Sequence, residues 1–356
     1  MRLAVNVGYF GLGMDRDVVA VAQEAERLGY AVVWAAEAYG SDAVSVLSWI
    51  GASTQRIGLG SAVLQIPART PAMTAMTAAT VDILSGGRFH LGLGVSGPQV
   101  SEGWHGVRFA APLGRTREYV DIVRAVLRRD TLSYAGRHFT LPLPDGPGKA
   151  LKLTVHPVRE HLPIYLAAVG PRSLELTGEV ADGWLAIFFS PEHAAASRAA
   201  LNTGLARRPA RASDASSRQP PFDICATVPV ALTEDLDAGR AAIAPYAALY
   251  VGGMGSRERN FYNQLACRMG FEEEAGVIQN LYLDGRHRDA AAAVPAEFID
   301  ATSLVGTVPR IRDRLTAYAQ AGVTTLAVSA FARSLEERIA TLRAVARALD
   351  EAGVGD

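Results

Sequence analysis

Residues 90–100, HLGLGVSGPQV, contain glycines in the spacing that many enzymes use to bind a dinucleotide. Gly92, Gly94 and Gly97 spell G-x-G-x-x-G. In a true dinucleotide site, an acidic residue ends the next strand about 20 residues later. That place is taken here by residues 115–127, RTREYVDIVRAVL, whose apolar residues have helical spacing. The glycines therefore do not indicate a dinucleotide site. At a strand end they would let the backbone approach another ligand.

A second segment, GPRS at residues 170–173, has the composition of an anion-binding site. It follows a predicted strand and opens a predicted helix. The start of a helix offers backbone N–H groups and the positive end of the helix dipole. Pro171 suits the first turn of a helix, and Arg172 adds a guanidinium. These features together suit a phosphodiester.

Other common enzyme chemistries lack their motifs in this chain. The seven histidines show neither the His-x-His nor the His-Glu-x-x-His spacing, so we expect no metal site. No G-x-S-x-G element carries a serine nucleophile. Cys225 and Cys267 are isolated, which indicates two inert thiols in a reducing cytosol.

The composition argues against nucleic-acid and membrane partners. The 356 residues have a formal net charge of −1, with 35 Lys and Arg against 36 Asp and Glu. The first residues, MRLAVNVGYFG, have a strand pattern and not that of a signal peptide. No apolar run is long enough for a membrane span. We therefore expect a cytoplasmic protein, whose 49% hydrophobic residues can form a large core.

Short β-type runs alternate with helical patterns along the chain. The predicted strands are 2–7, 31–36, 57–64, 88–95, 163–169, 184–189, 222–232 and 323–329. The predicted helices are 17–28, 43–53, 71–84, 115–129, 171–180 and 335–349. Eight apolar strands, nearly all followed by helices, favour an α/β fold of the (β/α)8 TIM-barrel type over an open sheet.

No extended linker divides the chain, so we interpret residues 1–356 as a single barrel domain. Three segments, near 132–158, 203–221 and 246–300, do not fit the alternation of strands and helices. We treat them as insertions at barrel loops, and we expect 132–158 and 246–300 to line or cover the C-terminal mouth. Their Tyr, Phe and Leu content favours a moderately apolar small-molecule substrate.

In such a barrel, the functional side chains lie at the carboxyl ends of the strands. Asn6 ends the first predicted strand, and Gly94, Ser96 and Gln99 lie at the end of the fourth. We expect these four residues to contact a cofactor. For Asn6 and Gly94, the alternative interpretation is a packing role inside the barrel. Glu37 ends the second strand and is a candidate acid. Its alternative is a loop carboxylate that caps the next helix or pairs with an arginine.

Several segments together resemble one protein family. They are AERLGYAVVWAAEAYGSD (25–42), STQRIGLGSAV (53–63), ARTPAMTAMTAATVDILSGGRFHLGLG (68–94), PLGRTREYVDIVRAVL (112–127), PIYLAAVGPRSLELTGEVADGW (163–184) and SLVGTVPRIRDRL (303–315). The chain resembles the bacterial-luciferase-like superfamily. Within it, the chain is most similar to the coenzyme F420 (deazaflavin)-dependent oxidoreductases, such as methylene-tetrahydromethanopterin reductase. The resemblance covers essentially the whole chain except 203–221 and parts of 246–300.

The resemblance implies where a cofactor would bind. In the family, the deazaflavin lies in the C-terminal mouth of the barrel. A bulge with a non-prolyl cis peptide, at the end of the third strand, lies behind the deazaflavin ring. The matching residues are Ser61, Ala62 and Val63, with Ala62–Val63 as the cis bond. The family's phosphate site matches Gly170, Pro171, Arg172 and Ser173.

One position departs from the alcohol- and sugar-phosphate-oxidising members of the family. Their second strand ends in Asp-His, and the His is a catalytic base; the matching pair here is Glu37-Ala38. Alcohol oxidation needs a group that takes the hydroxyl proton. The missing imidazole therefore favours a reductase that adds hydride to a C=C, C=N or methylene-type group. Glu37, Glu102 and His105 remain as candidate proton donors, and we predict Glu37 and Glu102 as catalytic.

Two other functions stay open on the sequence alone. One is an FMN-dependent monooxygenase that uses oxygen and reduced flavin, because FMN and F420 both carry a similar ring and a phosphate. The other is a protein that binds the cofactor without catalysis. The resemblance also implies a homodimer. The apolar helix at 71–84 is a candidate for its interface, with packing on its own barrel as the alternative. A separate flavin or F420 reductase would be a further partner.

Overall fold

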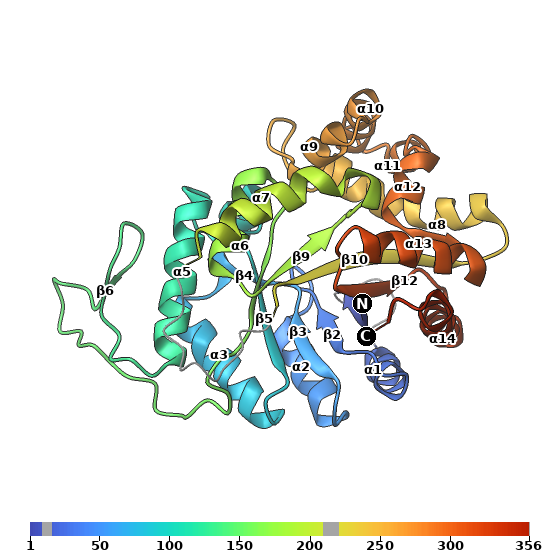
Figure 1. Ribbon diagram of the computed structural model, residues 1–356. Helices are drawn as coiled ribbons and strands as arrows, with labels where there is room; N and C mark the ends of the chain where they lie inside the picture. The colour runs from blue at the N-terminus through green and yellow to red at the C-terminus, as the bar shows by residue number, and fades with distance from the viewer. Residues whose placement is uncertain (9–15, 209–220, 356) are drawn as a thin grey trace.

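The eight predicted strands form a closed parallel barrel (Figure 1). The computed structural model describes residues 1–8, 16–208 and 221–355. In ring order, the strands are β1 (Arg2–Gly8), β2 (Val32–Ala35), β3 (Gly58–Ser61), β5 (Phe89–Gly94), β8 (Ile164–Ala167), β9 (Gly183–Ile187), β10 (Asp223–Leu232) and β12 (Thr325–Ala330). The ring closes where β12 pairs with β1, with Val328 opposite Val5. The prediction of a (β/α)8 TIM barrel is confirmed.

Two short strands that pair with strands of the ring were not predicted. β4 (Leu64–Gln65) continues the path of β3 and pairs with β5. β11 (Leu304–Gly306) pairs with the end of β10, from Val230 to Leu232, beyond the part of β10 that pairs with β9. Both are too short to produce an alternating pattern in the sequence.

Helices follow the strands and surround the barrel (Figure 1). They are α1 (Val18–Arg27), α2 (Ala43–Ala52), η1 (Ile66–Ala68), α3 (Pro71–Leu84), α4 (Pro98–Gly103), α5 (Pro112–Leu127), α6 (Pro171–Val180), η2 (Pro191–His193), α7 (Ala194–Ala206), α8 (Leu236–Ala248), η3 (Leu249–Gly253), α9 (Phe261–Arg268), α10 (Glu272–Leu283), α11 (His287–Ala292), α12 (Ala296–Thr302), α13 (Val308–Gln320) and α14 (Leu335–Ala352). The six predicted helices are all present, with small shifts at their ends. Local sequence sets these ends: the Thr70 side chain caps α3 by accepting a bond from the N–H of Met73.

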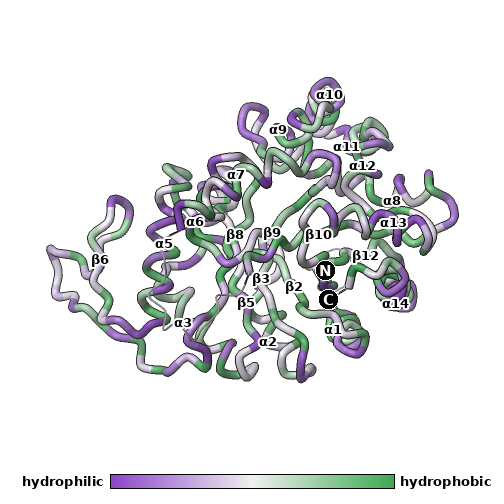
Figure 2. Tube along the Cα trace, viewed as in Figure 1, coloured by the Kyte–Doolittle hydropathy of each residue, from purple (hydrophilic) through white to green (hydrophobic). Residues whose placement is uncertain are grey.

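The main apolar core lies between the strands and the surrounding helices. Figure 2 shows the central strands mainly in green and white, with purple concentrated on the outer helices and loops. Inside the ring, the Trp34 side chain is fully buried and its ring centroid lies 5.2 Å from that of Tyr165. Below them, the Asp223 carboxylate accepts bonds from Tyr165 at 2.9 Å and Thr325 at 2.8 Å. These contacts fill the amino-terminal end of the barrel and leave its other end for a ligand.

Residues 246–300 form a helical layer at the mouth of the barrel. This layer runs from the end of α8 through η3, a π-helical turn, to α12. It has its own apolar cluster, which includes Val251, Ile278 and Phe298 and also buries Phe188 at the end of β9. Residues of this layer line the cavity at the mouth, as expected for this insertion.

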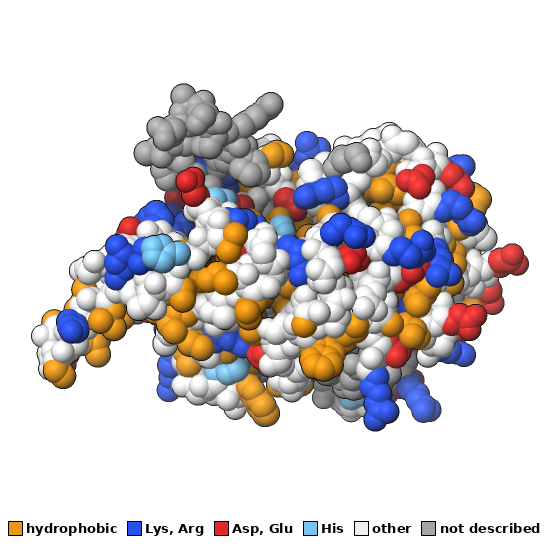
Figure 3. Space-filling view, turned by 90° about the horizontal axis from the view of Figure 1, so that it is seen from below, with side chains coloured by type: hydrophobic (Ala, Val, Ile, Leu, Met, Phe, Trp, Pro, Cys, Tyr) orange, Lys and Arg blue, Asp and Glu red, His pale blue; other side chains and the backbone are white. Residues whose placement is uncertain are grey.

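The expected position of residues 132–158 at the mouth is wrong. This segment connects α5 to the start of β8, so it lies toward the amino-terminal ends of the strands. It forms an arm with a small hairpin, in which β6 (Tyr134–Ala135) pairs with β7 (Thr140–Leu141). Figures 1 and 3 show the arm projecting from the body of the molecule. No residue of the arm lines the cavity.

The third expected insertion, near 203–221, overlaps the end of α7 at Ala206. Residues 209–220 of that segment lie outside the described residues, and so do Tyr9 and Phe10 at the end of the first predicted strand.

Candidate functional site

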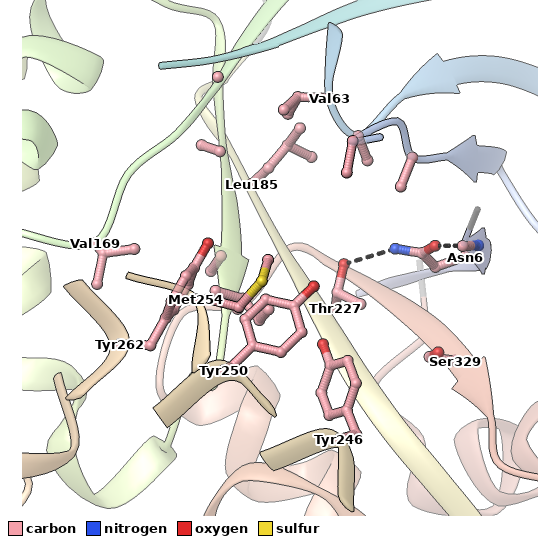
Figure 4. A pocket seen from close by; sticks show the side chains of 18 of the residues that line it. Asn6, Val63, Val169, Leu185, Thr227, Tyr246, Tyr250, Met254, Tyr262 and Ser329 are labelled. Atoms are coloured by element: carbon pink, nitrogen blue, oxygen red, sulfur yellow. Dashed lines mark hydrogen bonds between the residues drawn. The ribbon is translucent and has the colours of Figure 1, made fainter. Parts of the chain in front are cut away.

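A cavity of about 1660 Å³ opens at the carboxyl ends of the barrel strands. Ligand pockets for a single small molecule are commonly about 300–1,000 Å³. The cavity therefore has room for a cofactor and a substrate together. Its walls come from the strand ends, from the start of α6 and from the helical layer at 246–300. Figure 4 shows side chains from these elements around the same space.

One wall of the cavity is formed by the end of β3. The peptide bond between Ala62 and Val63 is cis, as the resemblance implied. Both residues line the cavity. Gly94 lies opposite, and a Cβ on it would come within 2.5 Å of the Val63 Cγ2. Gly94 thus makes room for the Val63 side chain beside the cis bond.

The other glycine of the G-x-G pair has a different role. Ser61 is fully buried, and its hydroxyl donates to the carbonyl of Gly92 and accepts from the N–H of Gly92, both at 2.9 Å. A Cβ on Gly92 would lie 1.8 Å from the Ser61 carbonyl oxygen. Ser61 and Gly92 therefore join β3 to β5 inside the wall. Ser61 is not among the residues that line the cavity.

Glu37 lines the cavity, but its carboxylate is held by donors from three directions. One oxygen binds the Arg69 guanidinium and accepts from the N–H of Gln65 at 3.2 Å. The other accepts from the N–H of Ala43, at the first residue of α2, at 3.3 Å. The Glu37 side chain is 5% exposed. The structure thus shows both features of the alternative interpretation, the helix cap and the arginine partner.

Arg69 is fixed by a second acid. Its other terminal nitrogen donates to Asp42 at 3.0 Å. Burial alone would lower the pKa of Arg69, but the Glu37 and Asp42 carboxylates outweigh it and raise that pKa. Arg69 therefore stays charged and anchors the loop after β2 to the loop after β4.

Gln65 connects the same region to the loop after β5. Its amide nitrogen donates to the carbonyl of Ala38 at 2.7 Å, and its amide oxygen accepts from the Ser96 hydroxyl at 3.0 Å. Ser96 has a positive φ of 61°, in the left-handed region. Ser96 and Gln99 line the cavity. Gln65 lies among the strand-end residues expected at the mouth, but no individual role was predicted for it, because its two partners are distant in sequence.

The opposite end of the cavity contains the predicted anion site. Gly170, Pro171, Arg172 and Ser173 all line it. The Ser173 hydroxyl donates to the Gly170 carbonyl at 2.7 Å and accepts from the Gly170 N–H at 3.1 Å, which fixes the first turn of α6. The N–H groups of Arg172 and Ser173 belong to this first turn and have no acceptor within the helix. Arg172 is exposed, so its guanidinium is accessible to a ligand.

Polar side chains from β1 and β10 form the floor of the cavity (Figure 4). The Asn6 amide donates to the Thr227 hydroxyl at 3.3 Å and accepts from the N–H of Gly8 at 2.7 Å. Both Asn6 and Thr227 line the cavity. Asn6 was predicted here, whereas Thr227 lies in mid-strand and gave no sequence signal.

Three tyrosines of the 246–300 layer face this floor. Tyr246, Tyr250 and Tyr262 come from α8, η3 and α9, and Figure 4 shows their hydroxyl ends directed into the cavity. The aromatic content of this insertion was noted from the sequence. The individual tyrosines were not predicted, since a helical pattern alone does not tell which face meets the barrel.

Two predicted proton donors are not brought into the site. Glu102 is exposed on α4, where its carboxylate accepts from the N–H of Phe109 at 3.0 Å. His105 lies in the loop that follows α4. Neither residue lines the cavity. The other predicted site residues all line it, apart from Ser61.

Comparison with known proteins agrees with this geometry. The chain belongs to the family described as luciferase-like monooxygenase, whose profile matches residues 14–325. It is 45% identical, over 335 residues, to a Mycobacterium tuberculosis protein provisionally named as a coenzyme F420-dependent oxidoreductase, with 93% of this chain and 95% of that protein covered. The family assignment drawn from sequence resemblance is confirmed.

Two further matches carry the name of a tetrahydromethanopterin-type reductase. A 5,10-methylenetetrahydromethanopterin reductase from Archaeoglobus fulgidus is 29% identical over 306 residues, covering 84% of this chain and 85% of that protein. The solved structure of the coenzyme F420-dependent tetrahydromethanopterin reductase from Methanopyrus kandleri superposes with a TM-score of 0.79 at 22% identity, covering 96% of this chain and 97% of that one. The second likeness supports the fold alone.

The described residues contain neither a metal-binding cluster nor a membrane-spanning helix. No cluster of three or more His, Cys, Asp or Glu in the described ranges could hold a metal ion. Within the same residues, no helix combines the length and the apolar character that crossing a bilayer requires.

Proposed function

We propose that this protein is an oxidoreductase that binds the deazaflavin coenzyme F420 in the barrel mouth and reduces a small organic substrate. The observation that carries the proposal is one continuous cavity that joins Ala62 and Val63, at the end of β3, to the first turn of α6. The relative with 45% identity, named for F420 dependence, supports the same cofactor.

The residues present fit such a cofactor. Ala62 and Val63 offer a small, apolar surface for a planar ring, and Gly94 leaves the space that Val63 occupies. The first turn of α6, with the Arg172 guanidinium, would hold the phosphodiester. Ser96 and Gln99 would contact the cofactor between these two ends. A bound deazaflavin supplies hydride transfer at C5.

The protein's own residues would then orient the substrate. Asn6 and Thr227 present polar groups on the floor, and the tyrosines of the insertion cover it. Glu37 contributes by holding the strand ends through Arg69 and Gln65. Its predicted role as a proton donor, like that of Glu102, remains a proposal. Neither role gains support from the carboxylate contacts.

The test is a parallel titration of the purified protein with F420 and with FMN, followed by cofactor fluorescence. We expect tight binding of F420 and weak binding of FMN. The Arg172→Ala variant should weaken F420 binding by about tenfold or more, because a charge-assisted contact is lost. The Arg312→Ala variant, at a half-buried position on α13 outside the cavity, is the matched control and should bind like the wild type.

Other outcomes of the titration would identify the alternatives. Preference for FMN would support a monooxygenase that uses oxygen and reduced flavin. Tight F420 binding without any hydride transfer to a broad substrate panel would support a cofactor-binding protein without catalysis. Binding of neither cofactor would contradict the proposed function.

We also propose that the protein forms a homodimer through α3. This helix exposes Met73, Met76 and Leu84, which are 52%, 49% and 78% exposed, and Trp49 on the neighbouring α2 is 70% exposed. Side chains of this size and exposure on adjacent helices are typical of an interface. A separate reductase that supplies reduced cofactor remains a proposed second partner.

A further inference from the structure

The tyrosines of the mouth form one continuous aromatic wall. The ring centroid of Tyr250 lies 4.8 Å from that of Tyr246 and 4.8 Å from that of Tyr262. Phe188 packs behind them, with its centroid 5.5 Å from both Tyr246 and Tyr250. Such edge and tilted contacts fix the rings relative to one another. Tyr250 is therefore the central member of the wall, in ring contact with both other tyrosines.

Two backbone irregularities converge on this wall. Tyr250 lies in η3, a π-helical turn that directly follows α8, and α8 contains Pro245 in its interior. Single π-helical turns are frequent at functional sites. Phe188, although not a glycine, has a φ of 51°, in the left-handed region. Non-glycine residues in this region are costly and cluster at active sites. Neither feature is needed to close the barrel.

The described lining residues of the elements that carry the wall, α8, η3 and α9, include no charged side chain. Figure 4 shows Leu185 and Met254 near the wall, and the ring of Phe331 packs on Tyr246 with the centroids 5.4 Å apart. The charged lining residues that the structure describes, among them Glu37, Arg172 and Arg333, come from other elements: the end of β2, α6 and the loop after β12. The polar atoms next to the wall are thus hydroxyl and amide groups, such as those of Asn6 and Thr227.

We propose that the wall of Tyr246, Tyr250 and Tyr262 binds the acceptor group of an uncharged, planar, conjugated carbonyl substrate, and that the Tyr250 hydroxyl is its proton donor. The proposal rests on the proposed function. A carbonyl oxygen needs only hydroxyl donors, whereas a buried carboxylate or phosphate needs a cation, and the described lining residues of α8, η3 and α9 include none. Flat aromatic rings favour flat, unsaturated substrates.

The reaction balances with the cofactor of the proposed function. The conjugated C=C bond accepts a hydride, which carries two electrons, from the reduced deazaflavin, and one proton from the Tyr250 hydroxyl. The substrate becomes the saturated carbonyl compound and the deazaflavin is oxidised. The Tyr250 phenolate regains its proton from solvent. The Tyr250 hydroxyl thus supplies the proton in a site where the Glu37 carboxylate is already paired with the Arg69 guanidinium.

The first test measures substrate binding without any turnover. The probes are 4-phenylbut-3-en-2-one, a planar neutral enone, and cinnamate, which has the same skeleton with a carboxylate. Ligand-observed NMR titrations with the wild-type protein should give at least about tenfold tighter binding of the ketone. The Tyr250→Phe variant should lose about five- to tenfold of ketone affinity, because one hydrogen bond is removed. The Tyr134→Phe variant, in the arm outside the cavity, should bind like the wild type.

The second test separates this proposal from the cofactor assignment. Tyr250→Phe should bind F420 as the wild type does but reduce the enone about a hundredfold more slowly. Absence of F420 binding in the wild type would contradict the proposed function, while the ketone titrations would still decide the role of the wall. Equal ketone affinity in wild type and Tyr250→Phe, tighter binding of cinnamate, or no ketone binding would overturn the proposal.

Discussion

Glu37 and Arg69 form an ion pair in which the carboxylate also accepts two backbone N–H groups. The pair thus connects the ends of β2 and β4 to the start of α2. An acid at the end of the second strand is a natural candidate for proton transfer, yet every contact found for it is a donor. Its position therefore favours a structural role at the site.

The first prediction concerns this pair. Glu37→Gln should lower the free energy of unfolding by about 2 kcal/mol, because it leaves Arg69 only half paired in a largely buried site. Turnover should fall less than tenfold, whereas loss of a true proton donor costs about a hundredfold or more. Urea unfolding and steady-state kinetics measure the two effects.

A double-mutant cycle with Arg69→Gln provides the control. The two single changes should be strongly non-additive, since each removes the same interaction. A hundredfold loss of turnover in Glu37→Gln, with stability unchanged, would instead establish Glu37 as the proton donor.

The second prediction distinguishes the two glycines of the G-x-G pair. Gly92→Ala should destabilise the fold by about 3 kcal/mol, because its Cβ meets the Ser61 carbonyl oxygen in the backbone. Gly94→Ala meets only the Val63 side chain, so it should mainly displace that residue and weaken cofactor binding by about tenfold. Thermal unfolding and F420 titration report the two effects. Gly103→Ala, with nothing within 4 Å of its Cβ, is the control.

The third prediction concerns pH. Burial, assisted by the positive charge of Arg159, lowers the pKa of His90 from 6.5 to about 4. The unfolded chain therefore binds a proton at His90 before the folded chain does, so stability should decrease as the pH falls from 6.5 toward 4. The loss should approach about 3 kcal/mol. Urea unfolding between pH 7 and 4.5 measures most of it.

Two variants isolate this contribution from that of the carboxylates. His90→Gln should show a flatter dependence on pH over the same range, because it has no proton to gain. His156→Gln, at an exposed position, should keep the wild-type dependence. The same slope in all three proteins would show that His90 does not control this loss.

The fourth prediction concerns the dimer proposed for α3. Leu84→Glu places a charge on its most exposed apolar position and should shift the protein to a monomer in light scattering coupled to size-exclusion chromatography. Val277→Glu on α10 changes an apolar residue that is 50% exposed and should leave the dimer intact. A wild-type monomer at micromolar concentration would contradict this proposal.

The apolar surface of the arm is a separate feature. Leu143 and Leu151 are 64% and 66% exposed, and Figure 3 shows hydrophobic side chains gathered over the arm. The sequence indicated an insertion at residues 132–158, but its predicted position, at the C-terminal mouth, was at the wrong end of the barrel. The reason is topological: a segment between a helix and the next strand lies at the amino-terminal end in a barrel of this kind.

The sequence alone determined the features that depend on neighbours along the chain. Alternation of β-type runs and helical periods is local, so it predicted the eight strands of the ring. The GPRS turn predicted the start of α6 for the same reason, since Pro171 and Gly170 set that turn themselves. The resemblance added the Ala62–Val63 cis bond, which no local pattern indicates.

Only the tertiary structure decided which side chains meet. Glu37 and Arg69 are 32 positions apart, and Asn6 and Thr227 are 221 apart, so no spacing rule connects them. Whether Tyr250 faces the cavity depends on how η3 packs on Phe188, from another part of the chain. These contacts follow from the summed packing of the whole barrel, in which each residue's direction is set by distant partners. The strands and helices of the barrel can therefore be predicted from the sequence. The contacts between side chains at the mouth cannot, because they join residues that only the closed barrel brings together.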